Sequence, residues 1–316
     1  MKRKFWLVLF LLPIQLFAQD STLNNLMKGM EGADNGKKQP VKTFSSERTV
    51  NANTTETVGK GKMDFRVTHN FGDIGGTYGG VKTFFGLDAI TDLRIGFHIG
   101  LTDKLDLNVA RVKGADPQVT QLYELALKYK LMDQVENDPS HPVALALFAN
   151  TTVSARKADT AANLESSYKG FSDRMSQTIQ LIIARKFGKI SLQLNPTFVH
   201  TNYVVTNDEN SLFALGGAVR LPVTKNFNII VDYFHPFRSQ SSKDFFATRS
   251  VKFSDPIGIS FEILTAGHVF SLNFTNATEI LENRFIPRTT TSWSKGEFRW
   301  GFTISRKFVL WRNKTK

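Results

Sequence analysis

Residues 297–304 read Glu-Phe-Arg-Trp-Gly-Phe-Thr-Ile, and an apolar side chain occupies every second position. In an extended chain this spacing puts the apolar side chains on one face and the polar or small ones on the other. The apolar face carries Phe298, Trp300, Phe302 and Ile304, and the other face carries Glu297, Arg299, Gly301 and Thr303. Runs of about ten residues with this period recur from about Gly59 to Phe308, which predicts a succession of two-faced strands.

Twelve such runs can be counted, and their connections alternate between short and long. The runs lie near 62–71, 93–101, 105–111, 122–131, 143–151, 177–187, 190–200, 213–221, 227–235, 257–263, 268–275 and 297–308. Short connections occupy 102–104, 188–189, 222–226 and 265–267, with a longer one at 132–141, while long polar segments occupy 72–92, 156–173, 201–211, 236–256 and 276–296. This alternation predicts an all-β fold, a single antiparallel up-and-down transmembrane β-barrel of about twelve strands. The long loops are then expected to be exposed outside the cell, and both termini to lie at the short-turn end.

The alternative for this pattern is a soluble sandwich or a lipocalin-like barrel, which would bury its apolar face. The confinement of long loops to one end and the aromatic residues at strand ends favour a membrane barrel. No stretch after Ala18 has the run of about 20 apolar residues that a spanning helix needs.

The amino terminus predicts export. Met1 to Lys4 is basic, 5–17 is apolar, and Ala18 is a small residue at the boundary, as in a signal peptide occupying 1–18. We expect the location to be the outer membrane of a Gram-negative cell. Residues 19–57 are predicted to be a periplasmic segment, without a core of its own, that contacts the barrel mouth or lumen. The barrel is assigned to 58–311, and 312–316 is a polar tail.

Charge and cysteine content narrow the classes of partner. The net charge is +12, or +9 without Lys2, Arg3 and Lys4, and the charges are dispersed rather than clustered, so we expect no nucleic acid partner. The chain has no cysteine, which excludes disulfides and thiolate metal sites.

No catalytic or cofactor-binding motif stands out, and the sequence predicts neither an enzyme nor a bound cofactor or metal. His69, His200 and His235 lie near the ends of three separate runs, a position typical of interfacial rings rather than of converging metal ligands. The sequence of residues 75–83 partly resembles a phosphate-binding loop. It departs from that motif because Val81 separates Gly80 from Lys82, whereas the motif needs an adjacent Gly-Lys pair. Ser271 and His268 are three residues apart, on opposite faces of a strand.

The polar face of the runs carries charges of both signs. Its members are Asp64, Arg66, Arg94, His98, Asp106, Glu124, Lys128, Lys130, Arg220, Asp232, Glu262, Glu297 and Arg299. The candidates for lining the lumen are Asp64, Arg66, Arg94, Lys128, Arg220, Glu262 and Arg299. A mixed set of this kind is expected either along a narrow passage or in a filled, salt-bridged interior, because buried charges must pair.

Several motifs along the chain resemble a known family. They include Thr43 to Arg48, Asp64-Phe65-Arg66, His69 to Asp73, Ile182 to Phe187, Gly267 to Phe270, Asn273 to Asn276, Trp293 to Gly296 and Gly301 to Arg306. In these the chain resembles an uncharacterised outer-membrane β-barrel family, a domain of unknown function of Bacteroidetes-type bacteria. The resemblance implies the fold and the location, and it carries no activity or site residue.

The function expected from the sequence is a pore or passive transporter for small solutes. The alternative is a structural or partner-binding barrel with a closed lumen, followed by an outer-membrane enzyme. The expected partners are the lipid bilayer, small solutes and the machinery that assembles outer-membrane barrels.

Overall fold

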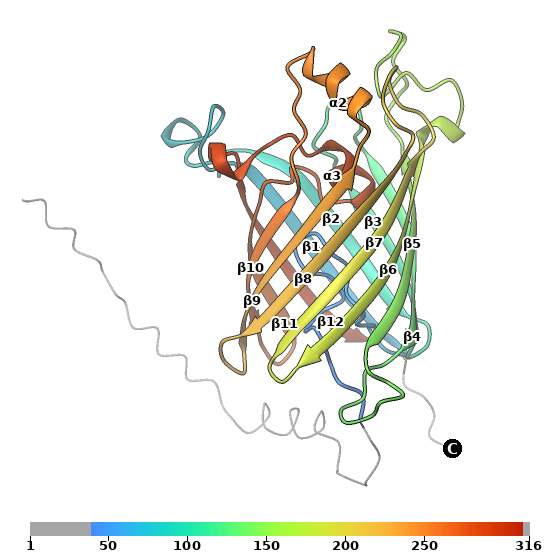
Figure 1. Ribbon diagram of the computed structural model, residues 1–316, viewed down its shortest axis with the longest axis vertical. Helices are drawn as coiled ribbons and strands as arrows, with labels where there is room; N and C mark the ends of the chain where they lie inside the picture. The colour runs from blue at the N-terminus through green and yellow to red at the C-terminus, as the bar shows by residue number, and fades with distance from the viewer. Residues whose placement is uncertain (1–38, 312–316) are drawn as a thin grey trace, which may run out of the picture. The chain divides into compact units, whose positions relative to one another are not determined.

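Twelve antiparallel strands close into one barrel in the computed structural model, which describes residues 39–311 (Figure 1). The strands are β1 Lys62–Asp73, β2 Ile90–Gly100, β3 Leu105–Val112, β4 Leu122–Met132, β5 Ala144–Ser154, β6 Met175–Phe187, β7 Ile190–Thr201, β8 Ser211–Pro222, β9 Phe227–Phe237, β10 Ile257–Leu264, β11 His268–Thr275 and β12 Arg299–Val309. Each strand pairs with the next along the chain, and β12 pairs with β1 to close the sheet. The predicted fold is confirmed. The assigned signal peptide at 1–18 and the polar tail at 312–316 lie outside the described residues.

The strand ends differ from the predicted ones by a few residues, most clearly at the long-loop end of β1, β2 and β12. There β1 extends to Asp73, and β12 begins at Arg299 rather than at Glu297. The register between these two strands shifts between Asn70 and Asp73, an irregularity that a period-two pattern does not reveal.

The two faces of the strands differ in the way that the alternation predicts. On β4, Tyr123, Leu125 and Leu127 are each about half exposed on the outer wall, whereas Glu124 and Lys128 are buried inside the barrel. The same contrast runs round the barrel, so the exposed wall is apolar and the interior is polar. This is the reverse of a soluble barrel and is the arrangement that a lipid surround requires.

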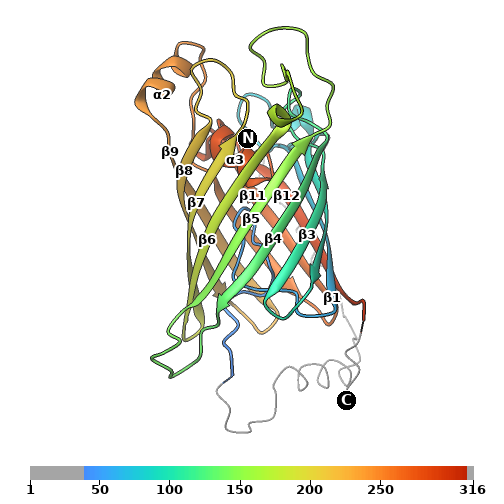
Figure 2. The ribbon, with the colours of Figure 1, turned by 90° about the vertical axis from the view of Figure 1, so that its right-hand side faces the viewer.

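The connections at the two ends of the barrel are unlike. Figure 2 shows short turns at one end and the long loops, with helices α2 (Gln240–Ala247) and α3 (Glu282–Arg288), at the other. Short 3₁₀ turns at Val81–Thr83, Ser172–Arg174 and Trp293–Lys295 complete the long loops. Within residues 39–311, no helix has the length and apolar character needed to cross a membrane.

Two stretches outside the strands fill the interior. Residues 41–58, here called the N-terminal hairpin, lie inside the barrel, and Thr43, Glu47 and Thr54 have no exposed surface. Residues 276–291, here called the outer plug, carry α3 and also turn inward, so that Leu281 and Phe285 are fully buried (Figure 2).

The expectation that the whole of 276–296 is an exposed loop is therefore wrong. Leu281, Phe285 and Ile286 fall at helical spacing and give α3 an apolar face. Phe285 and Ile286 join the buried apolar cluster that includes Phe44, Ala52 and Phe234, which lies between the outer plug, the hairpin and the wall. Leu281 packs in a separate cluster with Val112 and Leu122 of the wall. Phe234 and Phe285 meet edge to face with ring centroids 5.2 Å apart.

Candidate functional site: the filled lumen

The N-terminal hairpin is a compact turn held by its own backbone. Thr49 N donates to Ala52 O at 2.8 Å, and Thr54 N donates to Glu47 O at 3.1 Å. The Glu56 carboxylate accepts bonds from the backbone amides of Thr43 and Phe44, which ties the two arms together. Apart from Phe44, Val50, Ala52 and Val58, its buried side chains are polar, so the hairpin can remain inside only where the wall supplies hydrogen-bond partners.

The tip of the hairpin is held by one carboxylate of the wall. Asp232 on β9 accepts a bond from Thr49 Oγ1 at 2.6 Å, from Asn51 N and Asn51 Nδ2 at 2.8 Å each, and from Ala52 N at 3.3 Å. Four donors around one buried carboxylate satisfy its charge without a cation. Asp232 is therefore the main anchor of the tip.

The sides of the hairpin are bonded to cations and amides of the wall. Lys307 Nζ lies 2.6 Å from Glu47 Oε1, and Arg66 Nη2 lies 3.3 Å from Glu47 Oε2. Lys128 Nζ donates to the carbonyl oxygens of Glu47 and Glu56 at 2.7 and 3.0 Å. These contacts come from β1, β4 and β12, so the hairpin spans the lumen rather than following one strand.

The outer plug is held by a network of arginines and carboxylates. Arg284 pairs with Glu165 at 2.7 Å, Glu279 at 3.1 Å and Asp116 at 3.4 Å, and Arg288 pairs with Glu165 at 2.8 Å. Burial alone would raise the pKa of Glu165, but the charges of Arg284 and Arg288 outweigh it and lower that pKa below its ordinary value. Glu165 therefore stays ionised and ties α3 to the loop between β5 and β6.

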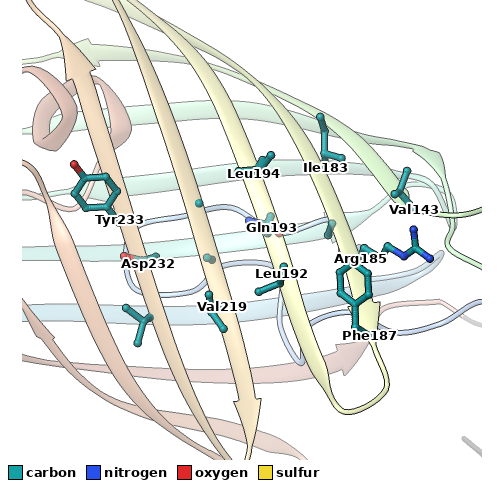
Figure 3. Close-up of a pocket in the computed structure, with 14 residues that line it drawn as sticks. Val143, Ile183, Arg185, Phe187, Leu192, Gln193, Leu194, Val219, Asp232 and Tyr233 are labelled. Carbon is teal, nitrogen blue, oxygen red and sulfur yellow. The ribbon is translucent and has the colours of Figure 1, made fainter.

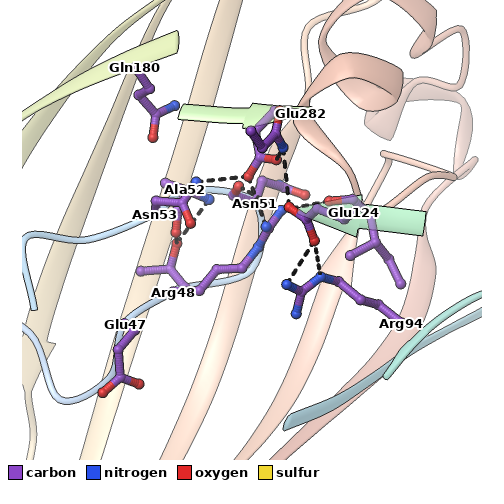
Figure 4. A network of polar contacts seen from close by, with 12 residues as sticks. Glu47, Arg48, Asn51, Ala52, Asn53, Arg94, Glu124, Gln180 and Glu282 are labelled. Carbon is purple, nitrogen blue, oxygen red and sulfur yellow. Dashed lines mark hydrogen bonds and ion pairs between the residues drawn. The ribbon is translucent and has the colours of Figure 1, made fainter. Parts of the chain in front are cut away.

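The two inward segments meet inside the barrel, as Figure 4 shows. Arg48 Nη1 lies 2.8 Å from Glu282 Oε1, and Arg48 Nη2 donates to Ile280 O at 2.6 Å. Asn53 Nδ2 donates to the same Glu282 oxygen at 2.9 Å. The wall joins this contact through Asn150, which donates to Glu124 at 3.1 Å and to Glu282 at 3.4 Å. The hairpin and the outer plug thus close the lumen jointly.

The residues proposed from the sequence to line the lumen lie at several separate points along it. Asp64 and Arg66 contact each other at 3.2 Å, and Arg66 and Lys128 bond to the hairpin. Arg94 pairs with Glu124 at 2.8 Å, close to the meeting point of the two segments (Figure 4).

The remaining three proposed residues lie away from that point. Arg299 pairs with Asp73 at 2.7 Å at the long-loop end, and Glu262 accepts a bond from Asn228 at 2.8 Å. Arg220 is only half-buried, and its Nε has no hydrogen-bond partner among residues 39–311.

Sequence reasoning expected residues 19–57 to contact the barrel mouth or lumen, but it singled out none of the residues that fill the lumen and missed the outer plug. Glu47, Arg48 and Glu282 lie in segments without strand periodicity, and their local composition is that of a loop. A signal that could have been used is the run of apolar residues Ile280, Leu281, Phe285 and Ile286 within a loop otherwise read as polar, since an exposed loop has no need of them.

The histidines noted in the sequence have other contacts. His69 stacks on Phe302 with ring centroids 5.2 Å apart, His200 Nδ1 lies 2.8 Å from Ser211 Oγ, and His235 Nδ1 lies 2.9 Å from Asp255 Oδ2. In the part of the chain that the structure describes, no group of three or more His, Asp or Glu side chains could hold a metal ion.

A hollow of about 570 Å³ interrupts the outer wall across β6 to β9 (Figure 3). Gly217 pairs with Leu194 on one side and Tyr233 on the other, and its missing side chain leaves the depression between them. Leu192 and Val219 extend the depression toward the short-turn end, where Arg185 lies (Figure 3). Val231, the partner of Val219 on β9, continues the same row. The hollow opens on the apolar outer face and is not part of the lumen.

The apolar exterior, the polar interior and the closed sheet define a membrane-bound β-barrel. A family model described as "Membrane bound beta barrel domain (DUF5777)" matches residues 44–308, and the chain belongs to this family. The match includes most of the N-terminal hairpin as well as the strands. It confirms the resemblance to a β-barrel domain of unknown function.

Solved structures similar to this chain include outer-membrane channels. An outer-membrane channel from Pseudomonas putida F1 is 12% identical, with 82% of this chain and 100% of that chain covered and a TM-score of 0.48. The NanC porin is 7% identical, with 78% and 98% covered and a TM-score of 0.46. The KdgM porin, solved in complex with disordered oligogalacturonate, is 8% identical, with 78% and 99% covered and a TM-score of 0.44. No curated protein sequence matches the chain.

Proposed function

We propose that the protein is an outer-membrane channel for small solutes that its own chain closes from both ends. The observation that carries this proposal is the way in which the lumen is filled. The lumen is occupied by two non-strand segments that the wall holds mainly through hydrogen bonds and ion pairs, while the strands themselves form a complete, closed sheet. Withdrawal of these segments would leave the wall intact around a space lined by charged and polar side chains.

The hairpin is suited to such a movement because it enters and leaves at one end. Val41 N bonds to Gln134 O in the turn after β4, and Thr57 Oγ1 bonds to Asp103 O in the turn after β2. Residues 43–56 could therefore leave the lumen toward the short-turn end while both of their flanks stay in place. The solutes that fit the proposed passage are small and polar, and the candidate lining residues are Asp64, Arg66, Arg94, Lys128, Arg220, Glu262 and Arg299.

Conductance in planar bilayers tests the proposal. One variant replaces residues 43–56 with a short Gly/Ser linker, and a control replaces the exposed residues 160–163 with a linker of the same composition. We expect rare openings in the parent protein and the control, and sustained current in the hairpin variant. Heat-modifiable migration on a gel reports whether each barrel is folded. Because the outer plug remains in this variant, a further variant also replaces residues 280–286 with the linker. A folded barrel that lacks both segments and carries no current would refute the channel.

The second candidate is a structural or partner-binding barrel. The closed lumen favours it directly, since the barrel as described has both ends occupied. In that case the long loops would carry the function. Neither the parent protein nor a folded variant without its lumen segments would then conduct. We propose no catalytic role for the protein.

The orientation belongs to the same proposal. We infer that the short-turn end faces the periplasm, that residues 1–18 direct export and are removed, and that the barrel assembly machinery inserts the chain. An origin in Bacteroidetes-type bacteria stays a prediction. Epitope tags in the loops at 156–173 and 236–256 should react with antibody on intact cells, and a tag at 102–104 should not. Labelling of the turn alone would reverse the orientation.

A further inference from the structure

A second hollow in the outer wall, of about 410 Å³, lies at the long-loop end of β2, β3 and β4. Leu93 and Ile95 on β2 form its apolar part, and Arg111 and Lys113, at the end of β3, lie beside them, with Thr120 and Gln121 before β4. Ile95 and Arg111 are direct partners across the β2–β3 pair, and both belong to the outward face. An apolar hollow therefore has two cationic side chains at its margin.

Both cations are fixed in place by backbone carbonyls. Lys113 Nζ donates to the carbonyl oxygens of Ile90 and Thr91, each at 2.9 Å. Arg111 Nη1 donates to the carbonyls of Val112 and Leu122, and its guanidinium lies 4.8 Å from the ring centre of Tyr123. The side chains are thus held against the wall rather than extended into solvent.

Their charge is not neutralised by the protein. Among residues 39–311, neither Arg111 nor Lys113 has a carboxylate within the distance of an ion pair, and Arg111 Nε and Nη2 make no hydrogen bond. Arg48, Arg94 and Arg284 inside the barrel behave in the opposite way, since all three pair with carboxylates. Two fixed, uncompensated cations beside an apolar hollow call for an anion that carries an apolar chain.

The membrane supplies such a ligand at this level. The hollow opens on the apolar wall that lipid surrounds, at the end of the strands where head groups meet the barrel, and Tyr123 is the kind of residue that marks that boundary. Phosphate oxygens suit a guanidinium and an ammonium group, and basic pockets on membrane proteins bind phosphorylated head groups. An acyl chain would occupy the hollow over Leu93 and Ile95.

We propose that this hollow binds a phosphorylated lipid of the outer leaflet, of the lipid A type, with the phosphate at Arg111 and Lys113 and an acyl chain along Leu93 and Ile95. The assignment to the outer leaflet rests on the orientation given under the proposed function. It does not depend on solute passage, because lipid binding is measured without any conductance.

Native mass spectrometry of the full-length folded protein in detergent tests the site. The probes are diphosphoryl lipid A, the same lipid without its phosphates, and inorganic phosphate. The test variant is Arg111→Gln with Lys113→Gln. The matched control is Arg185→Gln with Arg306→Gln, which removes two outward cations near the other end of the barrel. We expect diphosphoryl lipid A to bind the test variant about tenfold or more weakly than the parent, and the control like the parent.

Three results obtained with the lipid and the variants would overturn the site. The first is equal affinity of the parent for the lipid with and without phosphates, and the second is equal lipid binding by the parent and the test variant. The third is a dimer of the parent protein that the test variant loses, which would mean that a second copy of the chain rather than lipid covers the hollow. Binding of inorganic phosphate as tight as that of the lipid would also contradict it. If the double variant does not fold, Lys113→Gln alone serves, since Lys113 is exposed and lies outside the strands.

Discussion

Asp232 shows how one residue can determine what occupies the barrel. Its carboxylate is buried in the wall, and the donors around it come from a segment about 180 residues earlier in the chain, at Thr49, Asn51 and Ala52. A wall carboxylate without these donors would be a buried, unsatisfied charge. The hairpin tip and Asp232 therefore depend on each other.

Replacing Asp232 with Asn should loosen the tip. The amide oxygen can replace Oδ2, which accepts from Thr49 Oγ1, Asn51 N and Ala52 N, but the amide NH2 group then replaces Oδ1 and faces Asn51 Nδ2. Asn51 Nδ2 therefore loses this acceptor, and the bonds that remain lose the negative charge that strengthens them. We expect the free energy of local opening of the tip to fall by about 2–4 kcal/mol. Amide hydrogen exchange at Asn51 and Ala52 measures it. Glu262→Gln, a buried wall carboxylate that bonds to Asn228 instead, is the control, and equal exchange in both variants would contradict the anchoring role.

Glu165 should make the outer plug sensitive to acid. Its pKa lies below the ordinary value in the folded protein, so ionised Glu165 contributes stability above the pKa of the unfolded chain, about 4.3. That contribution is lost as the pH falls through the lowered folded value. We expect amide protection of α3, corrected for intrinsic exchange, to show a drop below about pH 4 that comes from Glu165. Glu165→Gln should abolish this step, and an equal drop below about pH 4 in that variant would argue against this origin.

At the level of the elements, a substitution in β10 tests whether the outer wall faces lipid. Phe261 lies at its centre on the outer face, where its ring neighbours Phe227 and Phe274. Phe261→Lys should lower the free energy of unfolding from vesicles by about 2–4 kcal/mol, because a charge near the bilayer midplane is costly. Val223→Lys, in the exposed turn after β8, should have little effect. Equal effects at the two positions would mean that Phe261 does not face lipid.

The last strand closes the barrel, and its loss should prevent insertion. β12 pairs with β11 on one side and with β1 on the other. A chain ending before Gly296 would leave two strand edges with unpaired backbone groups in lipid, each costing several kcal/mol. We expect such a chain to show no heat-modifiable folded band, whereas removal of residues 312–316, which lie outside the described part of the chain, should be tolerated. A truncated chain that still migrated as a folded barrel would defeat closure by β12.

For the molecule as a whole, the contact between Arg48 and Glu282 couples the two ends of the lumen. Arg48 belongs to the hairpin and Glu282 to the outer plug, and both are almost fully buried. If the channel opens, release of one segment should ease release of the other, because the remaining charge would lose its partner.

A double-mutant cycle with Arg48→Met and Glu282→Gln measures this coupling. Each single change should raise the open probability in planar bilayers, and the effect of the two together should fall short of their sum by about 0.5–3 kcal/mol. Lys130→Met, which removes a partly exposed ion pair with Asp133 at the short-turn end, should leave the open probability unchanged. Additive effects of the two changes would mean that the segments move independently.

The sequence by itself determined the wall of this protein. In strands such as β4 and β12, neighbouring side chains point to opposite faces, so the order of apolar and polar residues states which face meets lipid and which meets the interior. The lengths of the connections can also be read along the chain. Their alternation between short and long indicates the up-and-down topology, in which each strand pairs with the next. These features depend on neighbours in the chain and can be read from it.

Only the tertiary structure decided what fills the lumen that this wall encloses. Arg48 meets Glu282, and Asn51 meets Asp232, across separations of about 230 and 180 residues, and no local period records such a pairing. The composition of 41–58 and 276–291 is that of loops, because their polar groups find partners in the wall rather than in a ladder of their own. Arg111 and Lys113 likewise acquire Leu93 and Ile95 as neighbours only through the pairing of β2 with β3. The open or filled state of the lumen follows from contacts that exist only once the barrel has closed.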